Sequence, residues 1–332
     1  MPIHFNSESY STHIRCSSVF SYGKTALCAL LLVACASAQS NSTTITEPVL
    51  GLVFDVGAQS VRTLTGIPAA SRVGGTMGDG TPLAAAAISS QLSYALALDG
   101  AGTVMLVSQS GQQPVTGLRA GAVLAAVSPA GMAAAVYFGD TGKASILTGM
   151  PDAPKVLREV LLDGPPSALA VSDDGASLAA VVDLAANQAT VFFYSDGPGQ
   201  GLLSDRRFPS LEFVPGGGSL LVATENAVYL YQGRQGLQLL TDQRDGVTNV
   251  VGAAASGDGA RIFISMASGQ VAVRNLAAST QTLISCSCQP AGMWRLRGKA
   301  VFRLNELGTG PLWVIDGDAT QPRILFVAGG IL

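Results

Sequence analysis

Few residues in this chain have the types and spacing needed to activate a nucleophile. The 332 residues include two histidines, His4 and His13, and both lie within the first 38 residues, which we expect to be removed on export. A Ser-His-Asp or Cys-His nucleophile needs a histidine base, and many metal sites need histidine ligands. We therefore expect a mature chain that is not an enzyme, with no catalytic residues, no metal and no cofactor.

Paired carboxylates are the remaining route to acid–base chemistry, because Asp and Glu alone can cleave glycosidic bonds. Most candidates fall in predicted turns, where aspartate is favoured for local hydrogen bonds. These turn residues are Asp99, Asp140, Asp173, Asp174 and Asp258. Asp316 and Asp318 offer oxygens to a Ca²⁺ ion, but the rest of an EF-hand-like loop is absent. We expect turn roles for these carboxylates.

Cys286 and Cys288 are separated by a single residue. In an oxidising compartment, two thiols this close can form a disulfide if the backbone bends. Two free structural thiols are the alternative. A metal site would need further ligands, which the sequence does not place nearby.

The densest basic and aromatic cluster consists of Trp294, Arg295, Arg297 and Arg303. Arginine with tryptophan is the composition of a protein-interface hot spot. Long side chains that bury their stems in a final repeat would give the same pattern. The cluster is therefore a candidate interface, with a structural role as the alternative.

These residues belong to a repeated framework. A short pattern recurs six times at intervals of 39 to 44 residues, and such a period is typical of a repeat array. Each copy reads as the end of a strand, a polar turn containing glycine, and a new apolar strand; we call this turn the first turn. The first turns lie near Ser89, Ser128, Ser172, Val214, Ser256 and Arg297.

One complete repeat predicts strands over residues 122–128, 132–138, 143–148 and 155–161. Four short antiparallel strands of this kind make one blade of a β-propeller. Residues 52–55 and 60–64 read as a third and a fourth strand, and the segments 43–46 and 327–332 are the candidates for the missing strands of that blade. We therefore expect an all-β propeller of seven four-stranded blades, six from clear repeats and one closed by both termini.

The first turns resemble those of the propeller families with Ser-Pro-Asp-Gly turns, namely the WD40-like, YVTN and TolB-type repeats. The clearest copies are residues 126–131, 170–175 and 255–264, and the resemblance covers about residues 85–300. No Trp-Asp dipeptide occurs, so the bacterial YVTN-like group is the closer match. The resemblance implies the fold and says little about activity. Lactonases that share this fold often use polar central residues, sometimes histidine.

The N-terminal region has the charged, hydrophobic and cleavage parts of a secretory signal, because Lys24 precedes the apolar run 26–34 and small residues follow. Residues 32–35 resemble a bacterial lipoprotein signal, in which Cys35 becomes the acylated N-terminus. Residues 36–38 fit ordinary signal peptidase equally well. We expect a signal peptide over residues 1–38, or 1–34 in a lipoprotein, a flexible tether over 39–46 and the propeller over 47–332.

Composition narrows the choice of partner. Nineteen basic and 22 acidic residues give a net charge of −3 without a basic block, so nucleic acid is not an expected partner. Only 12% of residues are charged, against about 25% in an ordinary domain, which predicts strands buried on both faces. Contact with a membrane is expected only through a lipid at Cys35.

Two functions from different classes fit this sequence, and a purely structural module of a larger envelope assembly is a third. The first is a non-catalytic exported propeller, periplasmic, anchored as a lipoprotein or secreted, that binds a protein or a cell-envelope component. The alternative is a hydrolase or lactonase-like enzyme that uses Asp, Glu and Arg in the central channel. Charged residues on the innermost strands would favour the enzyme, and the predicted strands 84–88, 123–127 and 168–171 carry almost none.

Overall fold

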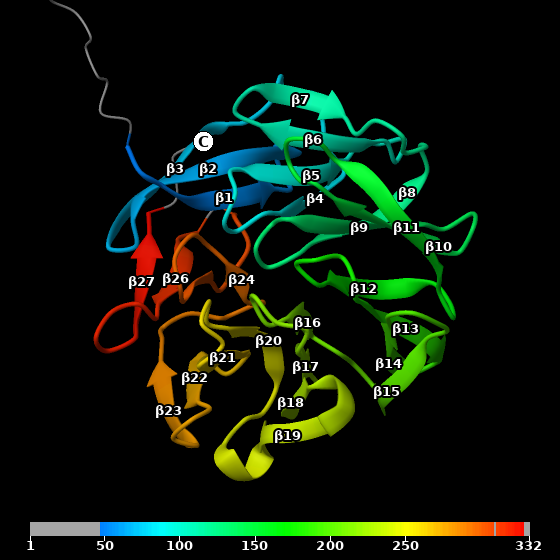
Figure 1. The fold of residues 1–332 in the computed structure, drawn as a ribbon. Coiled ribbons are helices and arrows are strands. Elements are labelled where there is room, and N and C mark those ends of the chain that lie inside the picture. The colour runs from blue at the N-terminus through cyan, green and yellow to red at the C-terminus, as the bar shows by residue number, and fades with distance from the viewer. Residues whose placement is uncertain (1–46, 309, 329–332) are drawn as a thin grey trace, which may run out of the picture. The chain divides into compact units, whose positions relative to one another are not determined.

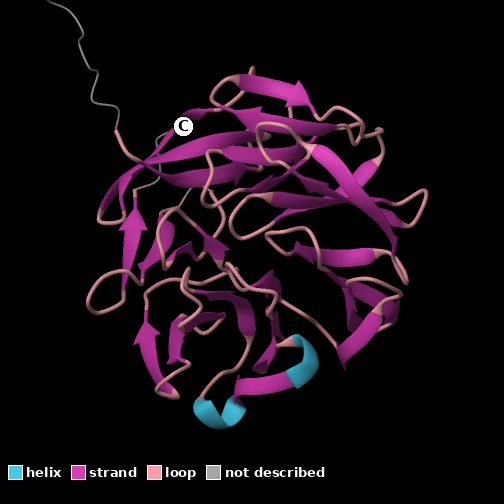
Figure 2. Ribbon diagram, in the orientation of Figure 1, coloured by secondary structure: helices cyan, strands magenta, loops and turns pink. Residues whose placement is uncertain are grey.

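The computed structural model describes residues 47–308 and 310–328. These residues form seven β-sheets arranged as blades around a central axis (Figure 1). Within the described residues the only helices are two short 3-10 turns, η1 (Gly233–Gln235) and η2 (Gln243–Asp245), on the outside of one blade (Figure 2). No helix in the described part is long and apolar enough to cross a membrane. The all-β, seven-bladed prediction is confirmed.

We number the blades along the chain, and in each of them the strands pair in sequence order. Blades 1 to 3 consist of β1 (Val49–Asp55), β2 (Ser60–Ile67) and β3 (Ala70–Thr76); β4 (Ala85–Ile88), β5 (Tyr94–Leu98), β6 (Val104–Ser108) and β7 (Gly111–Pro114); and β8 (Ala122–Val127), β9 (Ala133–Phe138), β10 (Lys143–Thr148) and β11 (Lys155–Leu161). Blades 4 and 5 consist of β12 (Pro166–Val171), β13 (Leu178–Ala185), β14 (Gln188–Tyr194) and β15 (Gln200–Asp205); and β16 (Ser210–Phe213), β17 (Leu220–Ala223), β18 (Ala227–Tyr231) and β19 (Leu237–Asp242). Blades 6 and 7 consist of β20 (Val250–Ala255), β21 (Arg261–Met266), β22 (Gln270–Asn275) and β23 (Thr280–Ser285); and β24 (Trp294–Arg295), β25 (Val301–Arg303), β26 (Leu312–Asp316) and β27 (Arg323–Val327).

The apolar core is divided among the interfaces between blades. Seven clusters of buried side chains are present, and each joins two neighbouring blades. One of them packs Leu50, Val53 and Leu64 of blade 1 against Leu312 and Val327 of blade 7. The ring is therefore closed by side-chain packing of the same kind as at its other six interfaces. Burial on both faces explains the low charge content, since every residue of β5, β9 and β17 is buried.

Blade 1 differs from the expectation for the N-terminal strands. Residues 52–55 and 60–64 belong to β1 and β2, which are the first and second strands of a three-stranded sheet, so their assignment as third and fourth strands was wrong. The outer strand β3 makes one parallel bridge, between Arg72 and Ala328, the residue that follows β27. Arg72 also forms an ion pair with Glu47. The two ends of the described residues thus meet at one residue of blade 1, while residues 43–46 and 329–332 lie outside the described residues.

The first turns occur where the repeat predicted them, and their chemistry explains the recurring residues. In blade 4, the Ser172 hydroxyl donates a hydrogen bond to the Asp174 carboxylate (2.6 Å), which also accepts from the backbone N–H of Ala176 (2.9 Å). Gly175 follows with φ of 71°, in the left-handed region that favours glycine. Blade 6 repeats the arrangement with Ser256, Asp258 and Gly259.

Candidate functional site

The first strand of every blade faces a central cavity of about 510 Å³. Much of its wall is made of small or aliphatic side chains. Examples from five blades are Leu52, Ala86, Ala125, Ala170 and Gly252. These side chains are small or apolar, but polar atoms, including those of the charged residues, make up more of the cavity surface than apolar atoms. The charged side chains that reach the cavity offer its strongest interactions.

Four charged residues line this cavity, and three of them come from blade 7 or the loop after β25. They are Glu212 on β16, Arg295 on β24, Arg303 on β25 and Glu306. The Arg295 side chain is 7% exposed and donates from Nη2 to the Glu212 carboxylate (2.5 Å) and to the carbonyl oxygen of Ala255. This ion pair connects blades 5 and 7 across blade 6.

The surroundings of Glu212 have opposing effects on the pKa of its carboxyl group. Burial raises the pKa of its carboxyl group, because the charged form loses water. The positive charge of Arg295 and its hydrogen bond lower the same pKa. Burial is the larger effect, so the pKa stays above its ordinary value. A raised carboxyl pKa next to a buried cation is common at functional sites and also in structural ion pairs.

Arg303 is buried without a matching acid. It is 7% exposed, its guanidinium lies over the Trp294 ring at 4.1 Å from the ring centre, and it donates from Nη1 to the carbonyl oxygen of Asn305 (3.0 Å). No described carboxylate oxygen forms an ion pair with it within 4.0 Å. Burial lowers the pKa of Arg303 to about 10, and the nearby Glu306 opposes that shift through space.

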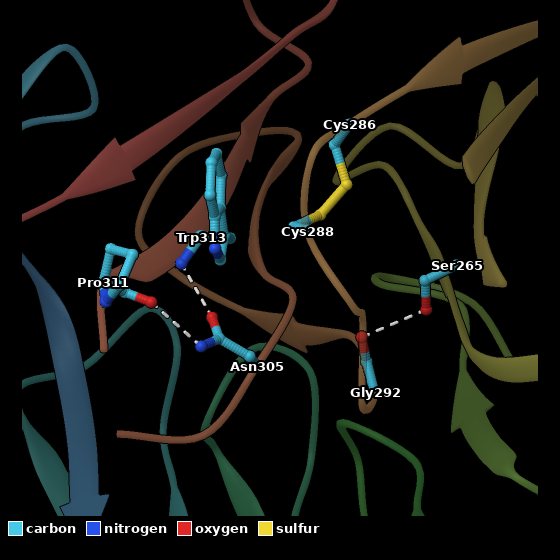
Figure 3. The surroundings of a disulfide bond; sticks show 7 residues. All are labelled: Ser265, Cys286, Cys288, Gly292, Asn305, Pro311 and Trp313. Carbon is cyan, nitrogen blue, oxygen red and sulfur yellow. Dashed lines mark hydrogen bonds between the residues drawn. A yellow bond between two sulfur atoms is a disulfide. The ribbon is translucent and has the colours of Figure 1, made fainter. Parts of the chain in front are cut away.

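The loop before β24 is held by several local contacts that position Trp294. The structure joins Cys286 to Cys288 through a disulfide with a Cα separation of 5.1 Å, and the Cys286 N–H donates to the carbonyl oxygen of Gly269. Further along, the Ser265 hydroxyl donates to the carbonyl oxygen of Gly292 (3.0 Å), two residues before Trp294 (Figure 3). The disulfide thus lies in the connection that leads into the cavity wall.

The loop after β25 is organised by Asn305. Its side chain donates to the carbonyl oxygen of Pro311 (3.1 Å) and accepts from the backbone N–H of Trp313 (2.7 Å) (Figure 3). These two bonds use the Asn305 side chain, and its backbone carbonyl oxygen accepts the hydrogen bond from Arg303. The loop that carries Glu306 is therefore tied to the same strand pair that presents Arg303.

The predicted interface cluster is divided between two places. Trp294, Arg295 and Arg303 line the cavity, whereas Arg297 lies exposed in the first turn of blade 7 and donates to the Ser93 hydroxyl (2.8 Å). Glu212 was missed at the sequence level. The available signal was its position: the repeat places residues 210–213 on a first strand, where an acid is unusual.

The turn aspartates lie outside the cavity lining. Asp99, Asp174 and Asp258 make the local bonds expected of them, whereas Asp140 and Asp173 bond to residues outside their own turns. Asp99 and Asp258 accept backbone N–H groups of their own turns, and Asp140 pairs with Arg119. Asp316 pairs with Arg323, and Asp318 accepts from the Lys299 N–H. Among the described residues, no group of three or more potential metal ligands occurs. Cys35, the lipidation candidate, lies outside the described residues.

Comparison with known proteins identifies the fold. No protein-family profile and no curated protein sequence matches this chain. Solved structures match over most of its length. A functionally unknown protein from Desulfotomaculum acetoxidans is 15% identical with a TM-score of 0.58, covering 85% of this chain and 96% of its own. The Cps50 (Swd1) β-propeller domain from Myceliophteria thermophila is 11% identical with a TM-score of 0.53, covering 73% and 86%.

A third match is to hydrazine synthase from Kuenenia stuttgartiensis, with 12% identity, a TM-score of 0.51 and coverage of 88% and 99%. At these identities the likeness extends to the fold alone. The protein is a seven-bladed β-propeller, a class defined by its ring of sheets and not by one activity.

Proposed function

We propose that this protein is a non-catalytic binding platform, whose partner is a protein or a component of the cell envelope. The observation that carries the proposal is the ion pair between Glu212 and Arg295. Arg295 is a structural partner for Glu212, the acid on the first strands, and most of the other residues that line the cavity are small or apolar. Rigid blades with variable loops suit a platform.

The proposal includes the finer assignments made from the sequence. The protein is a member of the YVTN-like or TolB-type repeat group and is exported, either anchored through an acylated Cys35 or cleaved after Ala38. The N-terminal sequence and the first turns support these assignments. A Cys35→Ala variant of an acylated protein should lose metabolic palmitate labelling and move from the membrane to the soluble fraction. Unchanged labelling or unchanged fractionation would favour cleavage after Ala38.

Partner capture tests the platform role. The full-length protein, with an affinity tag, is crosslinked in cells, recovered from the solubilised envelope, and its partner is then purified and titrated against it. We expect a saturable complex that is weakened by substitutions in loops on one face of the ring and unaffected by substitutions on the opposite face. Failure to capture any saturable partner under these conditions would contradict the platform role.

A hydrolase that works through carboxylates is the second candidate. The specific observation in its favour is that Glu212 and Glu306 line one cavity together with two arginines, and that burial raises the pKa of Glu212. The test is a screen of esters, lactones and glycosides with the purified protein and its Glu212→Gln and Glu306→Gln variants. Turnover that one of these substitutions abolishes would replace the platform proposal with the enzymatic one.

A further inference from the structure

Arg303 carries a charge that its surroundings do not balance. Burying a guanidinium removes its hydration, and this is costly unless a counter-ion or several hydrogen bonds replace the water. The structure supplies one hydrogen bond, from Nη1 to the Asn305 carbonyl oxygen, and the face of Trp294. The neighbouring Arg295, by contrast, has the Glu212 carboxylate. An anion in the cavity would complete the environment of Arg303.

The cavity has the size and lining of a small-molecule site. Ligand cavities usually measure about 300–1,000 Å³, and this cavity of about 510 Å³ falls in that range. Most of its lining residues are small or apolar, although polar atoms make up the larger part of its surface. Its lining residues in blades 1 to 4 are uncharged and mostly aliphatic or small, with the aromatic Phe54 in blade 1, and its charged groups come from blades 5 and 7 and the loop after β25. A ligand that satisfies both regions has an anionic end and an apolar body.

We propose that the central cavity binds an organic carboxylate with an apolar body, held by an ion pair with Arg303 and by contact with the wall formed by blades 1 to 4. The planar guanidinium, already stacked on Trp294, matches a carboxylate through charge-assisted hydrogen bonds. This site is independent of the macromolecular partner proposed above, so either proposal can fail without the other.

Glu306 makes the proposal more specific. This exposed residue lines the same cavity, and its charge attracts Arg303 through space, but the two form no ion pair within 4.0 Å. A bound carboxylate would approach the same cation and be repelled by Glu306. Removing the charge of Glu306 should therefore strengthen binding, whereas removing the charge of Arg303 should weaken it.

Calorimetric titration of the full-length protein with octanoate tests this site, with octan-1-ol as the neutral analogue. We expect octanoate to bind at least about tenfold more tightly than octanol, a difference of about 1.4 kcal/mol. Arg303→Gln should lose at least that factor, and Glu306→Gln should bind more tightly. Arg207→Gln, which removes an exposed arginine outside the cavity lining, should leave the affinity unchanged.

Two sources of such a carboxylate can be separated with peptides. An N-acetylated Ala-Leu-Leu peptide with a free C-terminal carboxylate is compared with its amide and with octanoate. Tighter binding of the free-acid peptide assigns the site to the C-terminus of a polypeptide, and tighter binding of octanoate assigns it to a small aliphatic acid; either result supports the proposal.

Arg303→Met keeps the test decisive if the glutamine variant folds poorly. Burying a charge without a counter-ion is costly, and an apolar residue of similar length avoids that cost, so this variant should unfold at the wild-type temperature or higher and no longer bind octanoate. Absence of octanoate binding by the wild-type protein at millimolar concentration would overturn the proposal. Equal affinity of wild type and the folded Arg303→Met variant would overturn it as well.

Discussion

Asp173 shows how one residue links three repeats. It lies in the first turn of blade 4, and its carboxylate accepts hydrogen bonds from the backbone N–H of Ala130 in blade 3 (2.6 Å) and of Gly216 in blade 5 (3.0 Å). The adjacent Asp174 stays within its own turn. Two neighbouring aspartates therefore have different tasks, one between blades and one within a blade.

Removing the Asp173 carboxylate should weaken the ring at three blades. In Asp173→Ala, two backbone donors lose a charged acceptor, and we expect a loss of about 1–3 kcal/mol in the free energy of unfolding. Urea denaturation at neutral pH measures this loss. Asp196→Ala, at an exposed position, is the matched control and should change little. Equal stability of the two variants would show that the bonds between turns contribute nothing.

The within-turn aspartates should make stability fall in acid. The hydrogen bond from the Ser256 hydroxyl lowers the pKa of Asp258 below its ordinary value of 3.8, and the hydrogen bond from the Ala260 N–H adds a smaller effect in the same direction. A folded-state pKa below the unfolded value gives stability that is present above the unfolded pKa and is lost as pH falls through the folded pKa. We expect Asp258→Asn to show a smaller decrease in melting temperature between about pH 5 and pH 2 than wild type. A larger decrease in the variant would contradict this sign.

At the scale of elements, blade 7 departs from the regular pattern at its innermost strand. Its first strand β24 has two residues, and the segment before it runs close against β20 of blade 6. Gly252 permits this approach, because a Cβ at that position would overlap the backbone nitrogen of Met293. The short strand, the disulfide and the close approach together set the position of Trp294 and Arg295.

Gly252→Ala should therefore force blades 6 and 7 apart. The obstacle is backbone and cannot rotate away, so we expect a loss of about 1–3 kcal/mol, the range for an overpacked core. Thermal unfolding followed by circular dichroism gives the measurement. Gly201→Ala is the matched strand control, since the nearest atom to its Cβ would be 3.8 Å away. A Gly252→Ala variant as stable as Gly201→Ala would refute the close-packing explanation.

Elements with a local signature could be predicted from the sequence. Ser172 and Asp174 make bonds inside one turn, so their repeat predicted each first turn. Strands β1 and β2 were assigned to the wrong places in their blade, because buried strands of any position share one apolar pattern. Glu212 and Arg295 form their ion pair although 83 residues separate them in the sequence, so no local pattern could predict that pairing. The nearness of Trp294 to Arg303 could be predicted because they lie on paired strands.

At the scale of the whole molecule, the ring has seven interfaces of similar construction, including the one between blades 7 and 1. Leu312 belongs to that closing interface, and Leu178 belongs to the interface between blades 3 and 4; neither has any exposed surface. In an open array the terminal repeats have a neighbour on one side only and are the first to unfold. In a closed ring every blade has two neighbours, so no interface is terminal.

Leu312→Ala and Leu178→Ala should therefore have comparable effects. Each leaves a cavity in a core between blades, and we expect each to lose about 2–5 kcal/mol in a single cooperative transition. Chemical denaturation monitored by tryptophan fluorescence and by circular dichroism checks both points. If Leu312→Ala instead produced an early separate transition of blade 1 or blade 7, the closing interface would be weaker than the rest of the ring.

Both ends of the described residues reach Arg72 in blade 1, through Glu47 and Ala328. The position of a blade in the ring therefore does not depend on which blade comes first in the sequence. A short peptide joining residues 47 and 328 would span neighbouring points, and the polypeptide could then be opened in any connection between two blades. Every contact between blades would survive such a circular permutation, because each depends on neighbours in the ring and not on neighbours at the ends of the sequence. The blade that comes first is thus a property of the gene and not of the folded ring.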